Sequence, residues 1–244
     1  MTKSSLLAFS AIALLSIPAI SQADTFSTYG DTTVVSPGDG ADPTAFQLTS
    51  GTIPYPDPTS YAGLQDQITS VLDVANLTTL SADYKMTVGT FGGGAPRFTL
   101  FDPSFNSAYV YWGTPTGGGG FSDPNAGGWA NTGNYASLAS PDVRVYVNGF
   151  GGINQPNTGV TWQQFVTEAG SIDLSYVTLD LDGGFSGPNG QQMLTDNFTV
   201  NADVFDAPAA VPEPATWAML ILGFLGVGAM VRKARRDMRG LLAA

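Results

Sequence analysis

Short segments in which apolar and polar residues alternate recur along the chain between residues 46 and 201. In residues 142–147 every second residue is Val, and in Tyr176–Asp182 Val or Leu alternates with Thr or Asp. An alternation of period two is typical of strands that bury one face and leave the other in solvent. Further strands are predicted at residues 46–49, 81–88, Arg97–Phe101, 108–112 and 197–201. The chain is therefore predicted to be all-β, an antiparallel β-sandwich of two packed sheets.

One short helix is predicted at residues 161–169. Thr161 and Gln164 have the spacing of a capping box, and Trp162 and Phe165 fall on one side of the helix. A second set of apolar residues also has helical spacing: Leu64, Ile68, Val71, Leu72 and Ala75. Because Thr and Asp surround this second set, a helix and a non-helical segment both remain open there.

The first 23 residues have the layout of a secretory signal peptide. Lys3 is followed by an apolar run over residues 6–20 and then by small residues that end at Ala23. A cation, an apolar run and a small-residue cleavage site in this order predict removal before Asp24, and therefore export through the inner membrane. The alternative is an N-terminal membrane helix, which the proline within the short run disfavours.

A second apolar run lies near the C-terminus and is followed by cations. Residues 215–231 contain no charged residue, and the cluster behind them consists of Arg232, Lys233, Arg235 and Arg236. A helix of this length spans about 25 Å, slightly less than a hydrocarbon core of ~30 Å, and long Arg and Lys side chains can cover the difference. We therefore predict a transmembrane helix at residues 215–231, with its basic end in the cytoplasm and the body outside.

The composition removes most enzyme classes. The 244 residues include no Cys and no His, so thiol nucleophiles, disulfides, zinc fingers and Ser-His-Asp triads are excluded. Carboxylate chemistry and the binding of hard cations through oxygen remain. Residues 24–210 carry three cations against 18 acids, a net charge of −15, which argues against nucleic acid as a partner.

The C-terminal residues also form a motif. Pro212, Glu213 and Pro214 make a Pro-Glu-Pro triplet, Trp217 follows, and the apolar run and the basic cluster come next. Residues 211–236 resemble the PEP-CTERM sorting signal, in its variant with Trp-Ala after the triplet. The resemblance implies recognition by an exosortase, a membrane-embedded transpeptidase-like enzyme that cuts near the triplet. It also implies a Gram-negative bacterium that produces extracellular polysaccharide. An ordinary C-terminal membrane anchor is the alternative.

These features divide the chain into four predicted segments: a signal peptide at residues 1–23, a β-sandwich at 24–206, a linker at 207–211 and a sorting signal at 212–236.

The body resembles secreted jelly-roll domains, including carbohydrate-binding modules, in three short places. These are Gly-Gly-Gly-Ala-Pro-Arg-Phe at residues 92–98, Asp-Gly-Gly at 182–184 and Asp-Asn-Phe-Thr-Val at 196–200. We therefore expect a jelly-roll-like sandwich in a non-catalytic protein of the cell envelope or extracellular matrix. A lectin-like carbohydrate-binding module is the alternative, and a glycoside hydrolase that uses a pair of Asp residues is a lesser one.

Three aromatic residues are candidates for contact with glycan. Phe121, Trp129 and Tyr135 lie in or at the end of a glycine-rich stretch over residues 113–135, and aromatic rings can stack on the apolar faces of sugars. The alternative is that these rings fold back and cap the end of the sandwich.

Charged residues of the body suggest two further sites. Asp180 and Asp182 alternate at the end of a predicted strand and, with Asp196, could hold a structural calcium ion, although the EF-hand pattern is absent. The alternative is a solvated strand end and turn, with no metal or other cofactor. Arg97 and Arg144 are expected to pair with carboxylates on the sheet, or alternatively to bind an acidic sugar.

Overall fold

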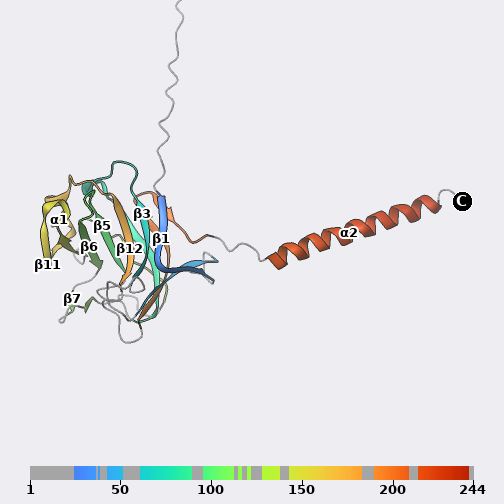
Figure 1. Ribbon diagram of the computed structural model, residues 1–244, viewed down its shortest axis with the longest axis horizontal. Helices are drawn as coiled ribbons and strands as arrows, with labels where there is room; N and C mark the ends of the chain where they lie inside the picture. Colours follow the sequence, from blue (N-terminus) through green and yellow to red (C-terminus); the bar gives the residue numbers. More distant parts are fainter. Residues whose placement is uncertain are drawn as a thin grey trace, which may run out of the picture.

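Figure 1 shows the computed structural model of the chain, in which a curled antiparallel sheet forms the body and a long helix lies near the C-terminus. The structure describes residues 25–36, 38, 43–51, 61–89, 96–112, 115–116, 120–121, 128–137, 143–182, 190–208 and 214–241. The predicted all-β class of the body is confirmed. The predicted signal peptide at residues 1–23 lies outside the described residues.

The strands form two layers of one continuous sheet. The larger layer is, in spatial order, β11 (Asn154–Thr161), β10 (Val143–Asn148), β6 (Ser107–Trp112), β5 (Arg97–Phe101), β12 (Tyr176–Asp182), β3 (Tyr61–Gln67) and β1 (Thr25–Val35). The smaller layer continues from β1 through β2 (Ala45–Ser50), β13 (Gln191–Val200), β4 (Leu80–Val88) and β9 (Ala130–Asn131), and β14 (Asp203–Phe205) pairs with β13. A separate hairpin joins β7 (Pro115–Thr116) to β8 (Gly120–Phe121).

Strand β1 carries the sheet from one layer to the other. Its first half pairs with β3, and its second half, from Asp31 onward, pairs with β2. Gly30 stands at the change of partner with φ of 63°, a conformation that L side chains rarely adopt. A Cβ there would also lie 2.1 Å from the carbonyl oxygen of Tyr61. The curl of the sheet therefore depends on glycine at this position.

The two layers enclose one hydrophobic core. Leu64, Phe98 and Leu179 reach it from the larger layer, and Leu48 and Met193 reach it from the smaller one, all with no exposed surface. Burial of these side chains supplies the main driving force for folding.

The predicted short helix is confirmed as α1 (Trp162–Ala169) with its capping box. The Thr161 N–H donates to Gln164 Oε1 at 2.9 Å, and the Gln164 N–H donates to Thr161 Oγ1 at 3.2 Å. Trp162 and Phe165 are buried, and Phe165 packs 5.6 Å from Phe150 in η3 (Phe150–Gly152). These contacts close the core beside β10 and β11.

The helical alternative for residues 64–75 is wrong. Leu64 lies in strand β3, and only η2 (Val74–Asn76), a single 3-10 turn, comes after it in this segment. Pairing of β3 with both β1 and β12 satisfies its backbone and buries Leu64, so tertiary pairing overrides the helical spacing.

The seven predicted strands are confirmed, although β13 begins six residues before the predicted start at residue 197. The long strands β1, β3 and β11 were not predicted, and neither were the short strands β7, β8, β9 and β14. Strand β1 has no buried residue among its 11, and β11 is rich in Asn, Gln and Thr. Neither strand has the apolar alternation on which the predictions relied.

The C-terminal region forms a helix, α2 (Pro214–Leu241), of 28 residues. It begins one residue before the predicted span at 215–231 and continues beyond it, and Figure 1 shows it apart from the sandwich. In the part of the chain that the structure describes, no helix combines the length and hydropathy needed to cross a membrane.

Candidate functional site

The outer face of the larger layer, on the side away from the core, carries an ordered set of tyrosines and arginines. Strand register places one row across six strands, in the order Tyr29, Gly63, Asp180, Arg97, Tyr111 and Arg144. The next row is Ser27, Gln65, Thr178, Thr99, Tyr109 and Tyr146. Residues in register on neighbouring strands point to the same side of a sheet. We call these two rows, together with Tyr61, the tyrosine face.

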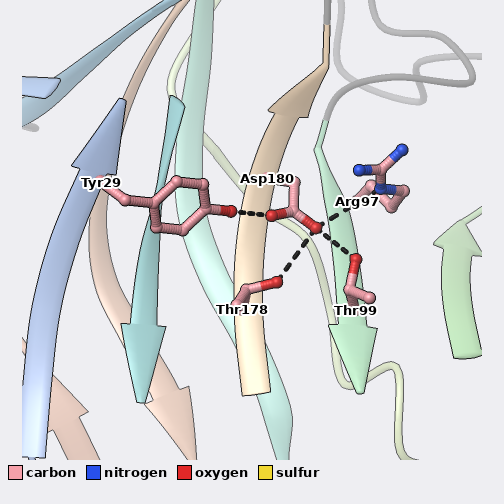
Figure 2. A network of polar contacts seen from close by, with 5 residues as sticks. All are labelled: Tyr29, Arg97, Thr99, Thr178 and Asp180. Atoms are coloured by element: carbon pink, nitrogen blue, oxygen red, sulfur yellow. Dashed lines mark hydrogen bonds and ion pairs between the residues drawn. The ribbon is translucent and has the colours of Figure 1, made fainter. Parts of the chain in front are cut away.

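Asp180 lies near the middle of the tyrosine face, and its carboxylate accepts four contacts (Figure 2). The Tyr29 hydroxyl donates to Oδ1 and the Thr99 hydroxyl donates to Oδ2. The Thr178 hydroxyl lies 3.0 Å and the Arg97 Nε 3.4 Å from the same Oδ2. Only 6% of Asp180 is exposed. Because a buried carboxylate is costly unless charges and hydrogen bonds compensate it, this network fixes the positions of its four donors.

Gly63 on β3 has no side chain, so the Tyr29 side chain has room to cross β3 and reach Asp180. Figure 2 shows the Tyr29 ring extending from β1 toward Asp180 on β12, and β3 lies between these strands. A Cβ at position 63 would lie 2.3 Å from the Tyr29 Oη and 2.4 Å from its Cζ. The ring therefore rests against the backbone of β3, and its other side faces outward. Tyr29 is half-buried, and the ring of half-buried Tyr61 lies 6.0 Å away.

Arg97 is held from two sides. Its Nε faces Asp180, and its Cζ lies 4.9 Å from the centre of the Tyr109 ring, within the range of a cation–π contact. The predicted pairing of Arg97 with a carboxylate is confirmed. For Arg144 the structure gives a hydrogen bond from Nη1 to its neighbour's carbonyl oxygen at 2.9 Å, and its pairing with a carboxylate stays a prediction.

A second tyrosine pair lies at the far side of the same face. The rings of Tyr111 and Tyr146 are 5.6 Å apart and nearly perpendicular, at 83°. A Cβ at Gly159 on β11 would lie 2.9 Å from the Cζ of Tyr146. A glycine on the adjacent strand therefore again leaves room for a tyrosine ring to lie against the sheet.

Asp196 contacts the chain that follows the last strand. It is fully buried, and its Oδ1 accepts the backbone N–H of Ala207 at 3.0 Å. The Thr44 hydroxyl lies 3.3 Å from the Ala207 carbonyl oxygen and 3.0 Å from that of Pro208. The first two residues of the predicted linker therefore lie against the sandwich, and Asp196 helps to hold them.

The three candidate calcium ligands have separate surroundings. Asp180 belongs to the larger layer and Asp196 to the smaller one, and the donors around them differ. Asp182 ends β12, and its side chain lies outside the described residues. Among the residues that the structure describes, no group of three or more carboxylates could hold a metal ion. A calcium ion stays a prediction without a described site.

The predicted aromatic candidates do not form one surface. Tyr135 is fully buried, edge-on to Phe98 at 4.7 Å, so the prediction that it contacts glycan is wrong and its ring belongs to the core. Trp129 is half-buried just before β9, and contact with glycan there stays a prediction. Phe121 is the last residue of β8, and its side chain lies outside the described residues.

One further buried carboxylate, Asp102, organises the turn between β5 and β6. Burial raises its pKa, but hydrogen bonds from the Asn106 side chain and from the N–H groups of Gly151, Asn106 and Ser104 outweigh it and lower the pKa below the usual value. The Gly151 N–H lies 3.0 Å from Oδ2 and ties this turn to η3. Asp102 therefore stabilises the edge of the layer and is not exposed for catalysis.

A hollow of about 390 Å³ lies between α1, η2 and residues 134–137. Trp162, Leu77 and Asn134 contribute to its wall. The Asn134 amide donates to a carbonyl oxygen of residue 78 and accepts two backbone N–H groups, so it holds the surrounding loops together. None of the described residues that line the hollow is charged.

The tyrosine face was not predicted from the sequence, although part of its signal was present. Tyr109 and Tyr111 alternate with Ala108 and Val110 in a predicted strand, which already places both rings on the outer side. Tyr29 lies in a strand without apolar alternation, so nothing in its neighbourhood indicated which face it occupies.

The residues of the sorting motif are only partly within the described chain. Pro212 and Glu213 lie outside the described residues. Pro214 is the first residue of α2 and Trp217 lies in its first turn, while Arg232, Lys233, Arg235 and Arg236 continue the same helix.

Comparison with known proteins supports the assignment of the tail. Residues 210–236 match the family model of the PEP-CTERM protein-sorting motif, which confirms the resemblance of the C-terminal residues to this signal. The motif marks the chain as an exported protein that is sorted by an exosortase. No curated protein matches the chain in sequence. A solved structure of an exo-beta-agarase is similar at 10% identity with a TM-score of 0.34, over 75% of this chain and 24% of that chain. The chain therefore spans about a quarter of the agarase chain.

Proposed function

We propose that this protein is exported, recognised at its C-terminal tail by an exosortase of the inner membrane, and delivered to the cell envelope or the extracellular matrix. Its β-sandwich then functions outside the cell without catalysis, in association with extracellular polysaccharide. The observation that carries the proposal is the PEP-CTERM motif at residues 210–236. The acidic body supports it, since a net charge of −15 suits solubility outside the cell.

In this proposal the apolar run over residues 215–231, although it is short for a membrane span, anchors the precursor before processing. The run over residues 215–231 contains no charge, and four cations follow it within five residues. Moving such a cluster through a bilayer costs on the order of 2.5 to 3.5 kcal/mol per charge, so the cluster would remain in the cytoplasm. The body, on the other side, would present its tail to the exosortase.

The structure offers a reason why the triplet can be recognised. Helix α2 begins at Pro214, so Pro212 and Glu213 precede the helix. A residue that precedes a proline is restricted away from the helical conformation, and this preference would favour an extended triplet that an enzyme can bind.

The test separates recognition from insertion. In cells, Glu213→Ala combined with Pro214→Ala should leave the protein in the membrane fraction but block processing, so that a full-length form accumulates. Intact-mass measurement of the protein from membrane and released fractions reports both outcomes. The matched control is Ala209→Gly combined with Ala210→Gly, two changes just upstream that should leave processing as in the wild type. Processing and release of the Glu213→Ala, Pro214→Ala variant at the wild-type level would contradict the sorting proposal.

A lectin-like module is the second candidate for the role of the body. The tyrosine face favours it, because this face presents half-buried aromatic rings beside polar groups on one surface. A matrix protein and a lectin-like module are compatible, since a protein held in polysaccharide needs a surface that contacts it.

The glycoside hydrolase is the least supported candidate. Such enzymes need two carboxyl groups that flank one bond. Asp180 is occupied by four donors, and Glu168 on α1 is exposed and accepts from Gln155 Nε2 at 3.3 Å. Release of reducing sugar from a polysaccharide, abolished by a single Asp→Asn change in the purified chain, would revive this candidate.

A further inference from the structure

We propose that the tyrosine face binds a neutral polysaccharide chain, which lies across the strands of the larger layer. This inference rests on the proposed function, because an exported body is what would meet such a polymer. It deepens the lectin-like candidate by assigning both a surface and a class of ligand.

Two tyrosine rings of the face, those of Tyr29 and Tyr146, rest against glycines of adjacent strands. Tyr29 rests against Gly63 and Tyr146 lies against Gly159, where in each case a Cβ would come within 3 Å of the ring. A ring that lies down on a sheet presents its outer side to solvent, whereas a ring that stands up presents only an edge. Sugars carry flat apolar C–H surfaces, which pack on aromatic faces of this kind.

The tyrosine face is also long. Tyr29, Tyr109 and Tyr146 lie on β1, β6 and β10, and all three are half-buried. The distance from β1 to β10 is five strand spacings of ~4.8 Å, or about 24 Å. The face is therefore long enough for several consecutive sugar units.

Polar groups are held in place between the rings. Asp180 orients the Arg97 guanidinium through Nε (Figure 2). Gln65 is half-buried in the next row. A guanidinium and an amide can both donate to sugar hydroxyl groups, and groups that are already held lose less entropy on binding.

The charge balance selects a neutral ligand. Arg97 is paired with Asp180, so this pair adds no net charge to the face. Arg144 is the other cation of the two rows, so the rows themselves carry +1, but the body over residues 24–210 carries −15. An acidic polymer would meet long-range repulsion, whereas a neutral one would not.

Affinity electrophoresis of the full chain, purified in detergent, tests the proposal. The native gels contain a soluble neutral β-glucan, a neutral galactan, or alginate as an acidic polymer. We expect at least one neutral polymer to retard the wild-type chain and alginate to have no effect. Tyr61→Ala and Tyr146→Ala, at opposite sides of the face, should each weaken retardation by about tenfold in dissociation constant.

Matched variants separate lost contacts from lost folding. Tyr146→Phe keeps the ring and should bind with a dissociation constant within about twofold of that of the wild type. Val204→Ala removes an apolar side chain on β14, outside the tyrosine face, where Val204 is 49% exposed, and should bind like the wild type. The urea midpoint of each variant is compared with that of the wild type to show that the variant is folded. The two Tyr→Ala changes lie on different strands, so the test can still be made if one of the two variants fails to fold.

Three results would overturn the proposal. If none of the neutral polymers retards the chain, a neutral polysaccharide is not the ligand. If alginate retards the chain and Arg144→Ala abolishes this retardation, the ligand is an acidic polysaccharide. Retardation that persists in both folded Tyr→Ala variants removes the tyrosine face as the site. Binding is measured on the purified chain and sorting is measured in cells, so failure of one leaves the other result standing.

Discussion

The two faces of β12 are both buried, but by different means. Val177, Leu179 and Leu181 face the core and have no exposed surface, while Thr178 and Asp180 on the outer face are 4% and 6% exposed. The opposite layer covers the inner face. Side chains from neighbouring strands cover the outer face, because Tyr29 and Arg97 reach toward Asp180 along the sheet.

The two faces therefore contribute differently, the inner face to the stability of the fold and the outer face to the positions of the side chains on it. Burial of apolar groups on the inner face contributes the transfer free energy that holds the layers together. On the outer face, hydrogen bonds to one carboxylate replace its hydrogen bonds to water, and the net contribution of each such bond is about 1 to 3 kcal/mol. We therefore expect inner changes to act on unfolding, and outer changes to act mainly on the arrangement of the tyrosine face.

The largest effect is expected from Leu179→Ala. The change removes a fully buried side chain between two layers that cannot collapse around it, so the free energy of unfolding should fall by about 3 to 4 kcal/mol. Urea denaturation followed by tryptophan fluorescence measures it. Under conditions in which Leu179→Ala remains folded, polysaccharide gels should retard it as they retard the wild type. A loss of less than ~1 kcal/mol would show that the inner face is not packed as described.

A smaller effect is expected from Gly63→Ala. The added methyl group would lie 2.3 Å from the Tyr29 Oη and 2.5 Å from the Leu179 carbonyl oxygen, so the ring must leave the sheet, at a cost of about 1 to 3 kcal/mol. Polysaccharide retardation should fall together with stability. Gly128→Ala is the control, because nothing lies within 4 Å of a Cβ at that position. Equal stability of the two variants would contradict the placement of Tyr29 over β3.

The smallest effect is expected from Tyr29→Phe. The ring and its packing remain, but the hydrogen bond to Asp180 is lost, so unfolding should become easier by about 1 kcal/mol. Tyr61→Phe, whose ring lies beside Tyr29, is the control and should change stability by less than ~0.5 kcal/mol. If Tyr29→Phe unfolds at a urea concentration no lower than Tyr61→Phe does, the Tyr29 hydroxyl does not stabilise the network around Asp180.

Local signals led to the correct predictions from the sequence. The capping box of α1 involves residues three positions apart, and the period of two in β10 and β12 is visible within seven residues. Strand β3 was missed because its apolar residues have helical spacing with residues 68–75, and only pairing with β1 and β12 resolves that ambiguity. Strand β1 was missed because it buries no residue on either side.

The sequence by itself determined the sorting motif, the all-β class and the charge of the body. An exosortase substrate is defined by a short linear segment, and net charge is a sum over residues, so neither needs tertiary contacts. Only the tertiary structure decided which polar and aromatic residues share a surface. Asp180 and Asp196 both lie within strands, but one organises the tyrosine face and the other holds Ala207, because β12 and β13 belong to different layers of the curled sheet. Tyr29 lies on the outer face because of the register and partners of its strand, whereas Tyr135, whose N–H donates to the Leu80 carbonyl oxygen at 2.8 Å, enters the core from a turn after β9.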